Sequence, residues 1–179
     1  MAFEALKKKI AKADPAGGGN KLRDGKGVLV VDRIVAKEGH KGLTVRIEAV
    51  VESSQKLSVV SPKTNETLNI SPNDPGTTVS IVENMKNEGS EGRILAALLA
   101  LFGYGQDADD TVKSEVLEAI QEETDKGPNL ARGLAVAYET ERFVTKKGIE
   151  MAGPRFQPIE NSDNDIKRRV AMLDERRKA

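Results

Sequence analysis

The chain has 179 residues, enough for one ordinary domain with additional segments, and its 28 Lys and Arg balance its 28 Asp and Glu. The absence of cysteine excludes disulfides and thiolate chemistry, and a single histidine leaves little for a histidine metal site or for Ser-His catalysis. No apolar run could span a bilayer, and the first residues lack the apolar stretch of a signal peptide. We therefore expect a cytoplasmic protein that is not an enzyme and needs no metal or cofactor.

Residues 1–19 predict a helical arm and a hinge. Phe3, Leu6 and Ile10 recur at helical spacing and form one apolar stripe among lysines. The glycines at 17–19 then favour a flexible connection. This segment is expected to lie outside the main domain.

Strands are predicted next. Residues 28–35 are rich in β-branched side chains, and residues 43–52 alternate between apolar and polar. The Gly39–Gly42 turn between them favours one long antiparallel hairpin. Residues 53–76 are polar and contain three prolines, which predicts a long loop that can include a short strand at 57–60. Residues 76–82 predict a third strand.

Two helices follow. Residues 93–102 are apolar on every side, which is typical of a buried helix, and Gly103 suits its C-terminal end. Asp107 to Asp110 place negative charge before a second helix, which Gly127-Pro128 ends.

The chain then returns to strand at 131–141 and, after a Lys146-Lys147-Gly148 turn, at 149–159, with an interruption expected at Gly153-Pro154. Residues 161–179 predict a helical tail whose stripe is Ile166, Val170 and Leu173.

This order of elements is that of an OB-fold: five strands with a helix between the third and the fourth. We therefore predict an α+β, mainly β protein built on a five-stranded OB-like Greek-key barrel, with helical arms at both ends. Its segments are the arm at 1–19, an OB-like nucleic-acid-binding domain at 20–160 and the tail at 161–179. Another small α+β sheet is the alternative.

Charge is unevenly distributed along the chain. Residues 83–125 carry three basic and eleven acidic side chains, a net charge of −8. Residues 126–157 carry six basic and three acidic ones, a net charge of +3. A basic face can attract a polyanion even when the total charge is zero.

Single strands of nucleic acid are bound by cations that contact phosphates and by aromatic rings that stack on bases. Phe102 and Tyr138 have the apolar neighbours of core residues, whereas Phe143 and Phe156 stand beside cations. Packing of these two rings inside the barrel is the alternative. The candidate nucleic-acid-binding residues are Lys26, Arg33, Lys37, Lys41, Arg46, Arg142, Phe143, Lys146, Lys147, Arg155 and Phe156.

Several segments resemble phage-encoded single-stranded-DNA-binding proteins of the OB-fold type, over roughly residues 20–160. They are Lys21–Gly27, Glu38–Gly42, Pro72–Ser80, Tyr138–Thr140 and Thr145–Gly148. The resemblance implies a protein that coats single-stranded DNA during phage replication or recombination, in the host cytoplasm. Many such proteins end in an acidic tail that recruits partners, whereas this tail is mixed and slightly basic.

A second hypothesis is a phage virion structural or assembly protein. The apolar stripes of the two terminal helices could dock on neighbouring subunits. The same stripes would also serve self-association of a DNA-coating protein, so they do not separate the two hypotheses.

Overall fold

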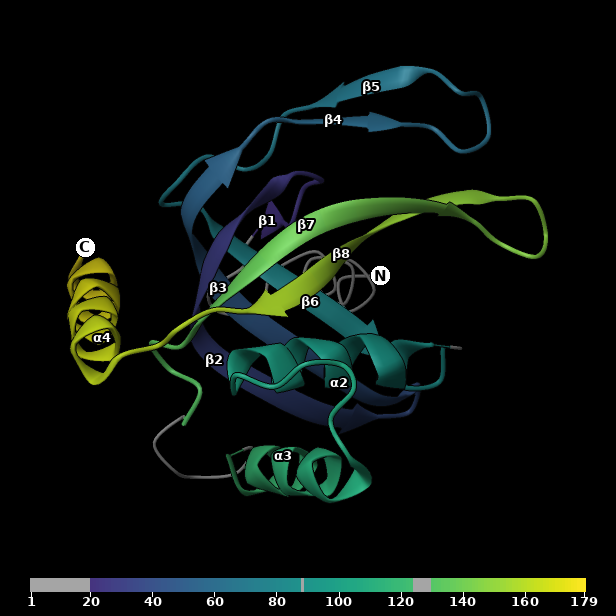
Figure 1. The fold of residues 1–179 in the computed structure, drawn as a ribbon. Helices are drawn as coiled ribbons and strands as arrows, with labels where there is room; N and C mark the ends of the chain where they lie inside the picture. The colour runs from purple at the N-terminus through teal and green to yellow at the C-terminus, as the bar shows by residue number, and fades with distance from the viewer. Residues whose placement is uncertain (1–19, 88, 124–129) are drawn as a thin grey trace, which may run out of the picture.

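The structure is a computed structural model that describes residues 20–87, 89–123 and 130–179, so the arm predicted at 1–19 lies outside it. The described residues form a mixed α+β fold with one large sheet, a separate two-stranded hairpin and three helices (Figure 1). The elements are β1 (Asn20–Lys21), β2 (Lys26–Gly39), β3 (Gly42–Gln55), β4 (Leu57–Val60), β5 (Thr67–Ile70), β6 (Thr78–Asn84), α2 (Ser90–Leu101), α3 (Asp110–Glu123), β7 (Ala135–Val144), β8 (Glu150–Pro158) and α4 (Asp163–Lys178). None of these helices is long and apolar enough to cross a membrane.

The large sheet has the strand order β1-β6-β3-β2-β7-β8, and only the β1–β6 pair is parallel. The predicted long hairpin is confirmed as β2–β3, which pairs from Lys26↔Gln55 to Gly39↔Gly42. A Cβ on Gly27 would lie 2.1 Å from the carbonyl oxygen of Ser53, so only glycine permits this close approach of the two strands.

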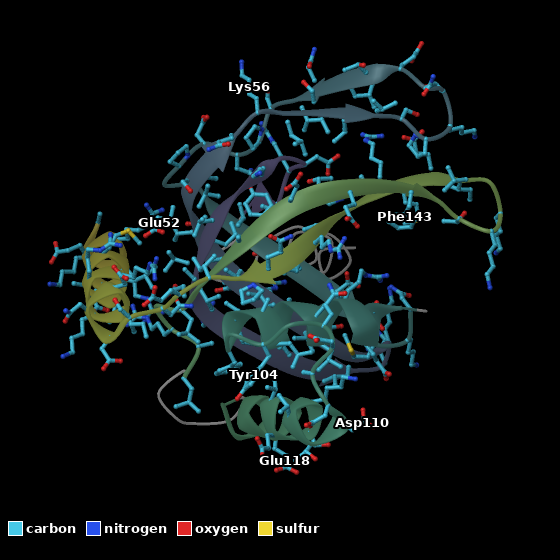
Figure 2. All side chains as sticks on the ribbon, viewed as in Figure 1. Glu52, Lys56, Tyr104, Asp110, Glu118 and Phe143 are labelled. Carbon is cyan, nitrogen blue, oxygen red and sulfur yellow. The ribbon has the colours of Figure 1, made fainter. Side chains whose placement is uncertain are left out.

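Two predictions about irregular segments need correction. The short strand predicted at 57–60 is confirmed as β4, but the rest of the segment is not only a loop. β4 pairs antiparallel with β5, and this hairpin, which Lys56 connects to β3, lies beside β7 (Figures 1 and 2). The interruption predicted at Gly153-Pro154 is absent, and β8 runs through both residues. Proline is tolerated there because β8 is an edge strand.

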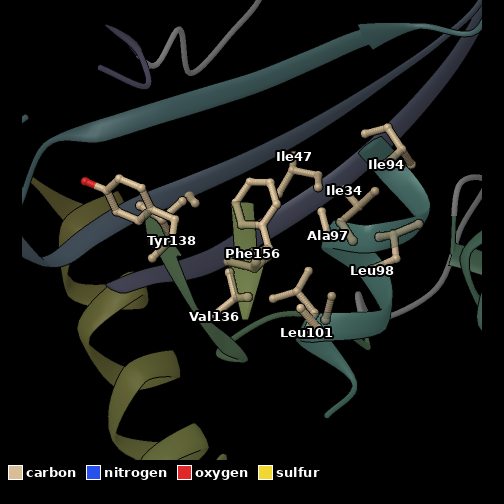
Figure 3. Packing of buried hydrophobic residues seen from close by; sticks show 14 of the residues in the cluster. Ile34, Ile47, Ile94, Ala97, Leu98, Leu101, Val136, Tyr138 and Phe156 are labelled. Carbon is tan, nitrogen blue, oxygen red and sulfur yellow. The ribbon is translucent and has the colours of Figure 1, made fainter. Parts of the chain in front are cut away.

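The predicted buried helix is confirmed as α2, whose apolar side chains pack on one face of the sheet (Figure 3). Ile94 and Leu98 of α2 are almost fully buried, as are Ile34, Ile47 and Val136 of the strands. Burial of each such side chain contributes about 1.5–3 kcal/mol. This cluster forms the main core.

The sheet remains open. Within the described residues β6 and β8 do not pair, so the strands do not close into the barrel that the sequence predicted. Helix α2 contacts β8, β7 and β6, and thus fills the space between the two ends of the sheet (Figure 1).

The predicted C-terminal helix is confirmed as α4, but it is not a free tail. Leu173 is 2% exposed and packs with Val30, Val50 and Ala135 on the sheet face opposite the main core. Arg169 donates hydrogen bonds to Glu52 at 3.1 and 3.3 Å. Because the sheet already covers this stripe, self-association through it, as predicted, would require α4 to detach.

Candidate nucleic-acid interface

The β7–β8 hairpin carries the candidate surface at its free end. Its turn is closed by hydrogen bonds from Thr145 N to Ile149 O (2.9 Å) and from Gly148 N to Thr145 O (2.8 Å). Gly148 has a φ of +74°, a left-handed conformation that favours glycine. The pairing continues through Phe143↔Met151 to Tyr138↔Phe156.

Side chains alternate between the two faces of this hairpin. Phe143 and Met151 lie opposite each other and share one face with Ile149; these three are 48%, 49% and 56% exposed. Figure 2 shows Phe143 near the free end of β7. Lys146 and Lys147 are exposed in the turn, and neither forms a salt bridge with another described residue. We call Phe143, Lys146, Lys147, Ile149 and Met151 the hairpin-tip surface.

Phe156 does not belong to this surface. It is 7% exposed and stands opposite Tyr138 in the main core, so its ring offers no open face to a base (Figure 3). The interpretation of Phe156 as a stacking residue is therefore wrong, whereas the core interpretation of Tyr138 is confirmed. Burial raises the pKa of the Tyr138 hydroxyl above its ordinary value.

Most of the predicted cations are held by carboxylates of the chain. Lys26 lies 3.5 Å from Glu139, Arg142 lies 3.1 Å from Glu150, and Arg155 lies 2.7 Å from Glu141. Arg33 and Arg46 both approach the buried Glu48. The hydrogen bond from Arg33 to Glu48 raises the pKa of that guanidinium, and the one from Arg155 to Glu141 does the same. These pairs reduce the positive charge available to a ligand.

The predicted residues therefore do not form one continuous surface. Lys41 is exposed in the β2–β3 turn, on the same side of the molecule as the β7–β8 turn (Figure 1). The side chain of Lys37 lies outside the described part of the chain. Arg33 lines a separate groove of about 640 Å³ beneath the end of α4, together with Arg176 and Arg177. In that groove Arg177 bonds to Asp32 at 3.0 Å and Arg176 to the carbonyl oxygen of Gly76 at 2.6 Å.

Ile149 and Met151 are members of the surface that sequence reasoning did not identify. Met151 in β8 and Ile149 just before it stand at odd numbers, whereas Phe156 of β8, at an even number, faces the core. Alternation would have placed both outward only if Phe156 had been known to face the core. In the described ranges, no cluster of three or more His, Asp or Glu side chains could hold a metal ion.

Comparison of the chain with protein-family models, with curated proteins and with solved structures gives no match.

Proposed function

We propose that this chain binds single-stranded DNA without sequence preference and coats it during phage replication or recombination. The observation that carries the proposal is the hairpin-tip surface, where the exposed ring of Phe143 near the end of β7 is followed within four residues by two exposed lysines. Among the described residues neither lysine forms a salt bridge. An aromatic ring stacks on any base, because every base has a π-face, and lysines contact any phosphate. Binding of this kind needs no catalytic group.

The order of the strands supports an OB-like interpretation of the fold. Within the large sheet, strands β2, β3, β6, β7 and β8 come in this chain order, with the β4–β5 hairpin inserted after β3 and with α2 and α3 between β6 and β7. An OB-fold is a five-stranded, partly open Greek-key barrel that binds oligonucleotides with its first and last hairpin loops. The corresponding loops here are the β2–β3 turn, with Lys41, and the β7–β8 turn, with Lys146 and Lys147.

The proposal predicts that Phe143→Ala weakens binding of a fluorescently labelled oligo-dT by about 5- to 150-fold, because stacking of one ring is worth about 1–3 kcal/mol. The measurement is fluorescence anisotropy at low salt. Tyr104→Ala is the matched control: Tyr104 is 43% exposed, close to Phe143 in accessibility, but follows α2 on another part of the molecule (Figure 2). Equal affinities of the two variants would contradict the role assigned to Phe143.

The exposed apolar residues also favour a second candidate, a structural or assembly protein. Phe143, Ile149 and Met151 could pack against a neighbouring subunit as well as against bases. This alternative predicts that wild-type protein fails to bind oligo-dT and that Phe143→Ala lowers its mass in light scattering.

A further inference from the structure

The β4–β5 hairpin is fastened to the β7–β8 hairpin on the side facing away from Phe143. Ser61, which follows β4, donates a hydrogen bond from Oγ to Glu150 Oε2 at 2.7 Å. Lys63 Nζ donates to the carbonyl oxygen of Gly148 at 3.2 Å. Glu150 pairs with Val144, next to Phe143 in β7, so its side chain lies on the opposite face of the hairpin from that ring.

Glu150 is the centre of this attachment, because each of its carboxylate oxygens has its own donor. Oε2 accepts from Ser61, and Oε1 accepts from Arg142 Nη1 at 3.1 Å. Arg142 in turn lies 3.6 Å from Asp24, in the connection between β1 and β2. Ser61 is 2% exposed and the Glu150 side chain is 16% exposed, so water competes little for these bonds. The donors also hold the pKa of Glu150 below its ordinary value.

A two-stranded hairpin without packing on either face is marginally stable in water. The free end of β7–β8 carries exposed Phe143, Ile149 and Met151 on one face, so its support must come from the other. The β4–β5 hairpin supplies that support through Ser61 and Lys63. A surface held rigidly in its binding conformation loses less conformational entropy when a ligand binds.

We propose that Glu150 is a positioning residue for the hairpin-tip surface: by joining Ser61 to Arg142 it holds the tip in the conformation that binds single-stranded DNA. This inference rests on the proposed function. Arg142, predicted as a phosphate contact, instead belongs to the attachment between the hairpins.

The first test compares two charge-removing variants by whether oligo-dT affinity rises or falls. Glu150→Ala and Glu141→Ala each remove one negative charge from the same hairpin, and charge alone makes either variant bind a polyanion at least as tightly as wild type. Glu141 is exposed and bonds to Arg155, so its loss leaves the β4–β5 hairpin in place. We expect oligo-dT affinity to be maintained or raised in Glu141→Ala and to fall about three- to tenfold in Glu150→Ala.

A second pair of variants changes no charge. Ser61→Ala removes the hydrogen bond to Glu150 and the one that Ser61 Oγ accepts from Thr64 N at 3.0 Å within the β4–β5 turn. Ser58→Ala removes only a bond to Asn69 within the same hairpin, 2.8 Å long. We expect weaker binding in Ser61→Ala only. If Glu150→Ala does not give a cooperative thermal transition, this pair decides the question.

A double-mutant cycle separates positioning from general destabilisation. If Glu150 acts through the ring, Glu150→Ala adds little to the loss already caused by Phe143→Ala. Additive losses would overturn the inference, as would Glu150→Ala affinity equal to that of Glu141→Ala. In either case, the proposed function would still be supported if wild type binds oligo-dT and Phe143→Ala binds it more weakly.

Discussion

Phe143 and Phe156 both stand beside cations in the sequence, yet they lie on opposite faces of one hairpin. Neighbouring residues of a strand point to opposite faces, so an adjacent arginine or lysine says nothing about which way a ring points. Tyr138, which the sequence predicted as a core residue, gives the direction of both rings. Phe143 is five positions along the same strand and so points to the opposite face, whereas Phe156 pairs directly with Tyr138 and so points to the same face. Alternation can thus be used at residue scale once one core residue is known.

Glu83 gives a residue-scale prediction about pH. It accepts hydrogen bonds from Arg93 Nε at 2.8 Å and from Ser90 Oγ at 2.7 Å, at the start of α2. These bonds hold the pKa of Glu83 below its ordinary value of 4.5, and the bond from Arg93 has the largest effect. A lowered folded-state pKa means that the carboxylate stabilises the fold above its ordinary pKa, and that this stability is lost as pH falls through the folded-state pKa.

We therefore expect the free energy of unfolding of wild type to fall more steeply below pH 4.5 than that of Glu83→Gln. Urea unfolding over a pH series measures it. Glu91→Gln, which changes an exposed carboxylate in the first turn of α2, should keep the wild-type dependence. Parallel curves for Glu83→Gln and wild type would show that the Glu83 contacts do not stabilise the fold.

At the scale of elements, a pattern predicts the type of an element better than its packing partner. β-branched residues predicted β2, alternation between apolar and polar residues predicted β3, and an all-round apolar run predicted α2. The stripe of α4 showed that one helix face would be covered, but a stripe carries no information about what covers it. The strand β4 was predicted, but β5 and its pairing with β4 were missed because β5 is short and lies among prolines. The attachment through Ser61 and Lys63 was missed because it is a long-range contact.

The packing of α4 on the sheet predicts how much Leu173 contributes to the free energy of unfolding. Leu173→Ala should lower the free energy of unfolding by about 2–4 kcal/mol, because it leaves a cavity against Val30, Val50 and Ala135. Lys167→Ala, an exposed change on the same helix, should stay within about 0.5 kcal/mol of wild type. Urea unfolding compares the two variants, and equal stabilities would mean that α4 is not packed on the sheet.

At the scale of the whole molecule, the segregation of charge acquires a spatial meaning. The acidic block includes α3, with Asp110 and Glu118, which packs beside α2 and also contacts β2. The free end of the β7–β8 hairpin lies on a different part of the molecule (Figures 1 and 2). The two regions therefore present different charge to a polyanion. The distribution of charge along the sequence predicted such faces, but only the fold could show that Arg33, Arg46, Arg142 and Arg155 are held by carboxylates. Within the part of the chain that the structure describes, Lys146 and Lys147 have no such partner.

Whether this fold presents a surface for single-stranded DNA can be measured by the fluorescence anisotropy of a labelled oligo-dT titrated with wild-type protein. The titration is made at about 50 and about 200 mM salt, beside a duplex of the same length. We expect a Kd of about 1 μM or tighter for the single strand at the lower salt, and weaker binding to the duplex. The higher salt should weaken binding, because lysine–phosphate contacts release counterions. Absence of binding to the single strand at the lower salt would contradict the proposed function.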